Sequence, residues 1–285
     1  MNILYLVFGR RLNDHVQANL SIRSFMRQLT DNDTIYVITT NPEYYSRIDT
    51  VRTITVSEDT LREWKGRHGF FWRVKIKAIE HIVKLCPDEH LLYIDSDTVL
   101  TGNLEQIRTL LDNGCGMMHL NEGHPGRMKS KSLKMWKKVA GHTYGGITLG
   151  RQHDMWNAGV VAIPRDKLRE TVALTLRICD GMLEDDVERV VIEQYSLSIA
   201  LYETTVLKPA EDYITHYWGN KGEFNDFAHE FFLKSYMAGR NVEDEVAQLD
   251  MEKLMSMPVR IKMSNINRLL TNLINNMFPN KIQTP

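Results

Sequence analysis

The sequence predicts an α/β fold with a mostly parallel central sheet flanked by helices. The first observation is a strand–helix–strand order near the start of the chain, which is typical of parallel sheets with crossover helices. The second is a set of short, continuously apolar runs, as expected of strands buried on both faces. The third is an ordinary globular composition: the 285 residues are 43% hydrophobic and 25% charged, which indicates a soluble core-forming chain.

The first part of the chain supplies the predicted strand–helix–strand unit. Residues 3–8 are an apolar strand that ends at Gly9. Residues 13–29 carry apolar side chains at helical spacing. Residues 34–39 form a second strand, and residues 51–56 alternate in polarity like a strand at the edge of a sheet.

The middle of the chain continues the pattern with a helix at 71–85 and a strand at 90–100. A short helix at 103–111 and a returning strand at 114–120 follow. Residues 121–153 are polar, rich in glycine and lysine, and weakly periodic, which predicts a long loop of the functional or mobile kind.

The last part of the predicted domain contains a strand at 156–164 and helices at 168–183 and 187–202. A final strand at 205–208 and a polar segment at 212–224 complete it. No repeat or linker divides these elements, so we expect one domain, residues 1–255.

Residues 256–285 form a separate basic, amphipathic helical tail in this prediction. Two alternatives stay open: the tail docks on the domain, or it rests on an anionic membrane surface. Its apolar positions would form one helical stripe: Ile261, Ile266, Leu269, Leu270, Leu273, Ile274, Met277 and Phe278.

The net charge of −1 argues against nucleic acid as a partner. The three cysteines, Cys86, Cys115 and Cys179, are widely spaced, which favours a reducing compartment over a disulfide framework. The apolar start is too short to span a bilayer and lacks the order of a signal peptide. We therefore expect a cytoplasmic protein, peripheral to the inner face of the membrane if the tail binds there.

The segment Asp95-Ser96-Asp97 directly follows the apolar run Leu91–Ile94. Two carboxylates at i and i+2 of a strand point the same way and can converge on one ion. Such a pair next to a buried strand requires a positive partner, and a hard divalent cation fits oxygen ligands. The alternative is an acidic turn that caps the next helix.

A second polar string lies far downstream, at His216, Gly219 and Lys221. Imidazole suits manganese as a third ligand. The lysine would neutralise a diphosphate oxygen as a point charge, and the glycine would let the backbone approach the phosphate closely. The alternative is a structural histidine.

Taken in order, these motifs resemble the family-eight type of retaining glycosyltransferases, the group of glycogenin and bacterial lipopolysaccharide galactosyltransferases. The resemblance implies a GT-A fold, a UDP-sugar donor and Mn²⁺ or Mg²⁺, and transfer of a hexose to a hydroxyl of a glycan or glycolipid. It places Asp95, Asp97 and His216 on the metal. The other implied site residues are Asn157, Ala158 and Gly159 in the sugar pocket, Glu193 and Gln194 under the reacting sugar, and Arg73, Ser96, Gly219 and Lys221 at the donor nucleotide and its phosphates.

The chain departs from that family in two places. Its first strand ends in Val7-Phe8-Gly9-Arg10, where the family has an acidic residue that touches uracil. Lys221 follows Gly219 by two residues instead of three. Retention is what the resemblance implies, whereas an inverting enzyme would need a carboxylate base, for which Glu193, Asp185 and Asp186 are available.

Two other functions remain open at this point. In a phosphatase of the haloacid dehalogenase type, Asp95 would be the nucleophile and Asp97 the acid/base. That motif, however, normally ends the first strand of its fold, and here a strand–helix–strand unit precedes it. The second alternative is a protein that binds a nucleotide-sugar without turnover.

Overall fold

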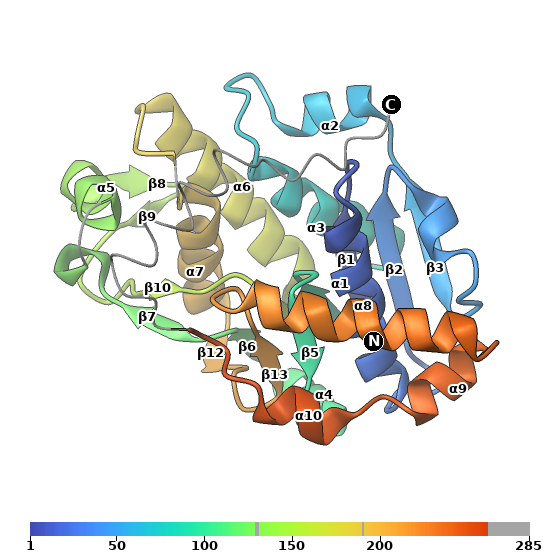
Figure 1. Cartoon of the computed structure of the whole chain (residues 1–285). Helices are drawn as coiled ribbons and strands as arrows, with labels where there is room; N and C mark the ends of the chain where they lie inside the picture. The colour runs from blue at the N-terminus through green and yellow to red at the C-terminus, as the bar shows by residue number, and fades with distance from the viewer. Residues whose placement is uncertain (129–130, 190, 262–285) are drawn as a thin grey trace, which may run out of the picture.

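The computed structural model describes residues 1–128, 131–189 and 191–261. Its centre is a seven-stranded sheet in the order β12-β6-β11-β4-β1-β2-β3 (Figure 1). All neighbours are parallel except β11, which runs antiparallel to both β4 and β6. The predicted α/β fold with a mostly parallel sheet is confirmed. The strands are β1 Asn2–Val7, β2 Thr34–Thr39, β3 Val51–Thr55, β4 Leu91–Ile94, β6 Cys115–Met118, β11 Val160–Ile163 and β12 Val206–Pro209.

Helices cover both faces of this sheet. Helices α1 (Leu12–Met26) and α4 (Leu104–Asp112) pack on one face, and α3 (Arg73–Leu85), α6 (Leu168–Glu184) and α7 (Ile192–Thr204) pack on the other. Strand β1 serves both layers, because Ile3 and Tyr5 belong to the first apolar cluster and Leu4 to the second. This alternation is the period of two that strand geometry imposes.

Smaller elements surround the layers. Strand β5 (Thr98–Leu100) pairs with β13 (Ile214–His216), β7 (Asn121–Gly123) with β10 (Met155–Trp156), and β8 (Thr143–Tyr144) with β9 (Ile147–Thr148). Helix α8 crosses in front of α1 in Figure 1. The remaining helices are α2 Glu58–Trp64, α5 Lys131–Val139, α8 Lys221–Met237, α9 Val242–Ala247 and α10 Met251–Ser256, with 3-10 turns at Pro42–Tyr45, Pro125–Arg127 and Arg165–Lys167.

Four expectations need correction. The strand expected at 156–164 is two strands, because β10 pairs with β7 and the chain enters the central sheet only at Val160. The strand expected at 90–100 is two strands, because the chain leaves the central sheet after Ile94 and β5 pairs with β13 instead. The loop expected at 121–153 contains helix α5 and short hairpin strands, and Met135 and Val139 of α5 are fully buried. The helix expected at 187–202 begins only at Ile192.

The described part of the C-terminal region packs on the domain. Leu254 of α10 and Met257 after it are buried in one apolar cluster with Tyr217 and Phe224. The domain boundary at 255/256 stays a prediction, and tail residues 262–285 lie outside the described residues. None of the described helices is long and apolar enough to cross a membrane.

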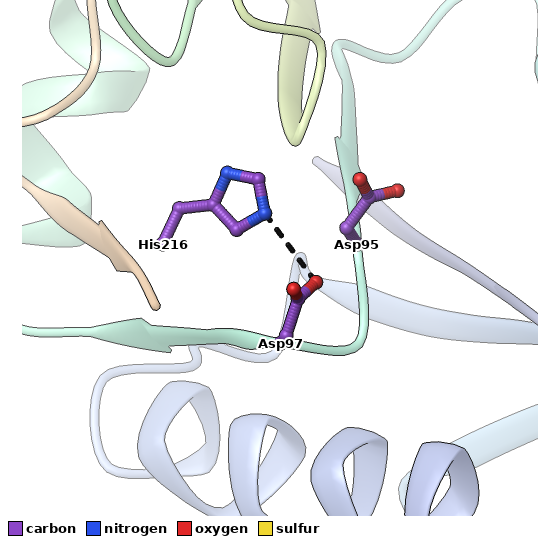
Figure 2. Close-up of side chains that lie close together, drawn as sticks. All are labelled: Asp95, Asp97 and His216. Carbon is purple, nitrogen blue, oxygen red and sulfur yellow. Dashed lines mark ion pairs between the residues drawn. The ribbon is translucent and has the colours of Figure 1, made fainter. Parts of the chain in front are cut away.

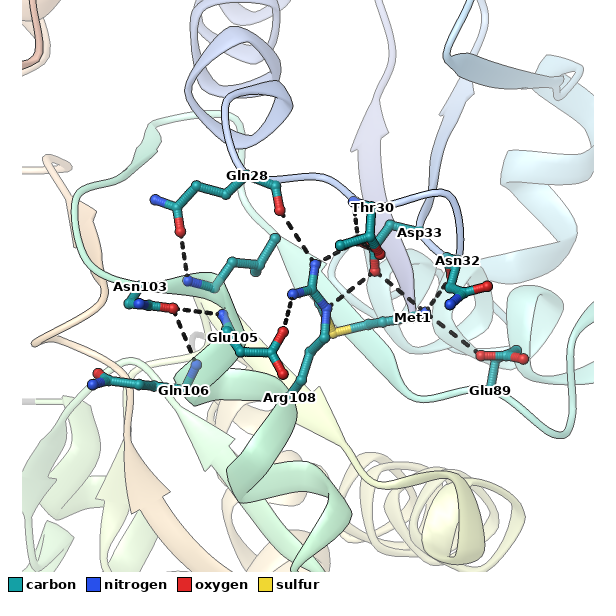
Figure 3. Close-up of polar contacts among 11 residues, drawn as sticks. Met1, Gln28, Thr30, Asn32, Asp33, Glu89, Asn103, Glu105, Gln106 and Arg108 are labelled. Atoms are coloured by element: carbon teal, nitrogen blue, oxygen red, sulfur yellow. Dashed lines mark hydrogen bonds and ion pairs between the residues drawn. The ribbon is translucent and has the colours of Figure 1, made fainter.

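A polar network ties the amino end of the sheet together (Figure 3). The Met1 ammonium donates to the carbonyl oxygen of Asn32 at 2.8 Å and lies 3.4 Å from the Asp33 carboxylate. Arg108 of α4 reaches the other oxygen of Asp33 at 2.5 Å and bonds Glu105 at 2.6 Å. The network therefore joins β1, the turn before β2, and α4.

Burial opposes ionisation of Asp33, but hydrogen bonds from Thr30 and Arg108 and the arginine's charge hold its pKa below the usual value. A depressed folded-state pKa stabilises the fold at pH values above the unfolded pKa, which is about 4. That contribution is lost as the pH falls through the folded-state pKa.

We therefore expect Asp33→Ala to lower the free energy of unfolding by about 2 kcal/mol at pH 7, because it leaves two cations with fewer partners. Glu105→Ala, at a side chain 69% exposed, should cost at most about 0.5 kcal/mol. Urea unfolding at pH 7 and pH 3 measures both variants. Equal losses for the two variants, or a larger Asp33→Ala loss at pH 3 than at pH 7, would contradict this account.

Candidate metal and nucleotide site

An open pocket lies at the carboxyl ends of β1 and β4, where ligands bind in open α/β sheets. It has a volume of about 630 Å³. One part of its wall is charged and another is aromatic and apolar. The lining residues are Leu6, Val7, Phe8, Gly9, Arg11, Asp14, Phe71, Trp72, Val74, Lys75, Tyr93, Asp95, Ser96, Asp97, Asn157, His216, Trp218 and Lys221.

Asp95, Asp97 and His216 meet in this pocket (Figure 2). One ligand atom of each lies within 4.8 Å of the others. His216 comes from a segment more than a hundred residues downstream, and the antiparallel pairing of β13 with β5 sets it opposite Thr98. The convergence expected from the two sequence motifs is thus present in the structure.

Asp97 is a buried carboxylate in the wall of this pocket. Its carboxylate lies 2.8 Å from Lys221 Nζ and 3.4 Å from His216 Nε2. Burial would raise the pKa of Asp97, but the hydrogen bonds and charges of His216 and Lys221 hold that pKa well below its usual range. The carboxylate is therefore ionised at neutral pH and available to a cation.

A second layer of hydrogen bonds orients His216. Asn157 Oδ1 accepts the backbone N–H of Gly159 at 3.0 Å and lies 3.0 Å from His216 Nδ1. Since that oxygen only accepts, Nδ1 carries a proton, and Nε2, which faces Asp97, is the nitrogen that a metal ion would bind in place of a proton. Metal-binding histidines are fixed in this way by their other nitrogen. Two carboxylates with an imidazole of this tautomer fit a divalent cation.

Gly159 makes room for the imidazole. A Cβ placed at Gly159 would lie 2.2 Å from His216 Cε1 and 2.3 Å from Nδ1, well inside contact distance. The resemblance implies that Gly159 lines the sugar pocket, but the space a side chain would fill there is held by His216. Ala158, its neighbour, is buried, and its carbonyl oxygen accepts from Lys75 Nζ at 3.1 Å.

Asp95 is held from the protein side. Tyr93 Oη donates to Asp95 Oδ1 at 2.7 Å, and Lys75 Nζ lies 3.2 Å from the same carboxylate. Lys75 also lies 3.3 Å from Glu193, and its cation faces the Tyr93 ring. Burial would lower the pKa of Lys75, but Asp95 and Glu193 outweigh it and raise that pKa. Lys75 therefore stays charged beneath the site.

Sequence reasoning missed Lys75, although a signal was present. Positions 75, 78, 79 and 82 lie on one face of α3, and the other three are Ala78, Ile79 and Ile82. A lysine on a buried apolar stripe requires a buried anion. The anions are Asp95, just after β4, and Glu193 of α7.

Glu193 and Gln194 occupy different environments. Glu193 is buried against Lys75, and its pKa is raised by burial despite the lysine. Gln194 Nε2 donates to Glu122 Oε2 at 3.0 Å, and Asn157 Nδ2 donates to Glu122 Oε1 at 3.1 Å. Glu122 of β7, in the segment expected to be a loop, therefore gathers two of the predicted site residues. Sequence reasoning did not single it out.

The four residues predicted at the nucleotide are not all together. Ser96 lines the pocket and Lys221 reaches Asp97. Arg73 instead points away, donating to Asp180 at 2.7 and 2.9 Å and to the carbonyl of Trp64 at 2.9 Å. Gly219 faces the protein, because a Cβ there would lie 2.8 Å from Arg260 Cγ.

Comparison with known proteins gives likenesses of structure only: no family model and no curated protein matches the chain. Galactosyltransferase LgtC in complex with donor and acceptor sugar analogues is similar at a TM-score of 0.48 and 11% identity, over 74% of each chain. An active-site mutant of LgtC is similar at 0.47 and 15%, over 73% of this chain and 71% of that one.

The apo form of mouse xyloside xylosyltransferase 1 is similar at a TM-score of 0.48 and 10% identity, over 73% of this chain and 85% of that one. By their names all of these proteins are sugar transferases, the class that the sequence motifs resemble. Identities of 15% or less with TM-scores below 0.5 do not assign the chain to a family.

We expect Gly159→Ala to weaken Mn²⁺ binding by roughly tenfold to a hundredfold, because the new methyl group displaces the imidazole that completes the ligand set. Gly222→Ala is the matched control, since nothing lies within 4 Å of a Cβ there. Calorimetric titration with Mn²⁺ measures both, and circular dichroism verifies folding. Wild-type Mn²⁺ affinity in a folded Gly159→Ala protein would contradict the assignment.

Proposed function

We propose that the chain is a metal-dependent glycosyltransferase that transfers a hexose from a nucleotide-sugar, a UDP-sugar by resemblance, to a hydroxyl of a glycan or glycolipid, with retention. The observation that carries this proposal is the meeting of Asp95, Asp97, His216 and Lys221 in a single open pocket with an aromatic wall. Carboxylates that hold a divalent cation, together with a lysine, are a typical binding site for a diphosphate. The flat faces of sugars and bases pack well against aromatic side chains.

Asp95, Asp97 and His216 would hold Mn²⁺ or Mg²⁺. When bound, the ion supplies Lewis-acid stabilisation of negative charge on the diphosphate. Lys221 is 47% exposed at the pocket rim and can turn its ammonium from Asp97 to a phosphate oxygen. Asn157 keeps His216 in the ligating tautomer, and Lys75 keeps Asp95 in place.

The aromatic wall fits the remaining parts of the donor. Phe71, Trp72 and Trp218 line the pocket and are 45%, 47% and 45% exposed. Exposed aromatic faces in a concave site offer stacking surfaces to a ligand. Phe8, the residue after β1, packs on Phe71 with ring centroids 5.7 Å apart and so supports the Phe71 part of the wall.

In the proposed transfer, the acceptor oxygen bonds to the anomeric carbon while the bond from that carbon to the diphosphate oxygen breaks. The electron pair leaves with the nucleoside diphosphate, and the hydroxyl proton is released, finally to solvent. Charge builds on the leaving group beside Lys221, which is where preorganised positive charge lowers the barrier. The anomeric centre becomes oxocarbenium-like, as in glycoside hydrolysis.

An inverting enzyme would need a carboxylate base in the pocket, and the positions of the three candidates, Glu193, Asp185 and Asp186, favour retention instead. Glu193 is buried against Lys75. Asp185 follows the last turn of α6 and accepts from Tyr144 Oη at 2.8 Å, and Asp186 follows it with a positive φ of 49°. None of the three lines the pocket.

The phosphatase alternative fits the fold poorly. Its motif normally ends the first strand of the fold, whereas here the motif follows β4, the fourth strand of the chain. A protein that binds the donor without turnover would use the same residues, so only a turnover measurement separates it from the transferase.

A thermal-shift and hydrolysis panel of nucleotide-sugars tests the proposal. At a ligand concentration of 100 Kd, binding stabilises the fold by about 2.7 kcal/mol, which corresponds to a rise in Tm of roughly 5 °C. We expect this rise only with Mn²⁺ or Mg²⁺, and we expect Asp97→Ala to abolish both the rise and slow donor hydrolysis.

Asp59→Ala is the control, since that carboxylate is 84% exposed and contacts only Arg62 of its own helix. Metal-dependent binding without any turnover, even with glycan acceptors present, would support the non-catalytic alternative. Phosphate release from a phosphomonoester that Asp95→Asn abolishes would overturn the transferase in favour of the phosphatase.

A further inference from the structure

Residues 257–261, which follow α10 and are called the strap here, run along the loop 217–220. This loop joins His216, at the end of β13, to Lys221, at the start of α8. Asn220 Nδ2 donates to the carbonyl oxygen of Pro258 at 2.6 Å. Gly219 and Arg260 form a parallel β-bridge, and the backbone N–H of Ile261 donates to the carbonyl oxygen of Gly219 at 3.3 Å. The strap thus holds the loop at two successive residues, through the backbone of Gly219 and the side chain of Asn220.

Arg260 adds a side-chain contact to this backbone pairing. Its guanidinium carbon lies 4.6 Å from the centroid of the Trp218 ring, within the range of a cation–π interaction. The aliphatic part of the same side chain covers Gly219, where a Cβ would lie 2.8 Å from Arg260 Cγ. The glycine is therefore needed for the close approach of Arg260.

The loop is anchored differently on its two sides. On the inner side, the Tyr217 backbone N–H donates to the Asp97 carbonyl oxygen at 3.0 Å, and the Tyr217 ring stacks on Phe224 at 3.9 Å. On the outer side, Trp218 is 45% exposed and lines the pocket. Its ring is covered from outside by Arg260, so the position of this wall depends on the strap.

We propose that Arg260 is a positioning residue that sets the outer wall of the nucleotide pocket by holding Trp218 and, through Gly219 and Asn220, the start of α8 at Lys221. This inference rests on the proposed function, since it concerns the binding of a nucleoside diphosphate. Arg260 itself does not line the pocket. It acts through the ring of Trp218 and the backbone of the loop.

The metal-ligand side and the Trp218 side of the site should respond differently to the loss of the Arg260 side chain. Hydrogen bonds fix His216 through Asn157 and fix Asp97 through the backbone N–H of Tyr217, and none of these bonds involves Arg260. Trp218 and Lys221 lie on the side that the strap holds. Loss of Arg260 should therefore weaken binding of the diphosphate and leave binding of the metal ion alone unchanged.

The experiment measures Mn²⁺ affinity and then UDP affinity at saturating Mn²⁺, both by calorimetry, in wild type, Arg260→Ala and Arg260→Lys. We expect Arg260→Ala to weaken UDP binding roughly fivefold, the size of one exposed cation–π contact, with Mn²⁺ affinity within twofold of wild type. Arg260→Lys keeps the cation and should restore part of the loss. Arg62→Ala, at a surface arginine 77% exposed, is the control and should match wild type.

A double-mutant cycle with Trp218→Leu tests whether the effect passes through the ring. If it does, Arg260→Ala adds little to the loss that Trp218→Leu already causes. Hydrogen exchange of peptides covering residues 217–221 reads the loop without any ligand, and we expect faster exchange in Arg260→Ala than in Arg62→Ala.

Wild-type UDP affinity and wild-type exchange in Arg260→Ala would overturn the inference, as would equal losses of Mn²⁺ and UDP affinity. If wild type binds no nucleoside diphosphate with Mn²⁺, the proposed function fails. Hydrogen exchange then decides by itself whether Arg260 holds the loop.

Discussion

The antiparallel pairing of β5 with β13 is the constraint on which the candidate site depends. It sets His216 opposite Thr98, and so beside Asp97, although the two residues are far apart in the sequence. The pairing is possible because the chain leaves the central sheet after Ile94. A strand that continued straight through Asp95 and Asp97 would have carried both carboxylates past the edge where β13 arrives.

Steric fit and buried charge then determine how the site is held. The missing side chain at Gly159 leaves space for the imidazole, and Asn157 fixes its tautomer. Beneath them, Lys75 is shared by Asp95 and Glu193, two carboxylates that would repel each other without it. Removal of one member of such a buried set leaves an uncompensated charge, which destabilises the fold.

The outer side of the pocket is built from different forces. There the contacts are the Arg260 cation on the Trp218 ring, a backbone hydrogen bond from Ile261 to Gly219, and a hydrogen bond from the Asn220 side chain to the Pro258 carbonyl. These interactions are individually weak and partly exposed. The side of the pocket at Asp95, Asp97 and His216 is therefore held by buried charge and hydrogen bonds, and the side at Trp218 by weaker, partly exposed contacts.

The sequence by itself determined the α/β class and the central strands and marked Asp95, Asp97, His216 and Lys221 as candidates, because apolar runs and pairs of charged side chains are local signals. Only the tertiary structure decided which side chains meet. Arg73 and Lys75 are neighbours on one helix, yet one binds Asp180 and the other Asp95.

The same holds for the two glycines of the predicted site. The sequence shows that a side chain is absent at Gly159 and Gly219, but the residues that fill the space, His216 and Arg260, come from other segments. Contacts between distant segments depend on strand pairing and helix packing, and a local sequence pattern does not predict them. Candidate site residues could therefore be named from the sequence, whereas Glu122 and Arg260 could not, and Lys75 gave only the signal of a lysine on an apolar helix face.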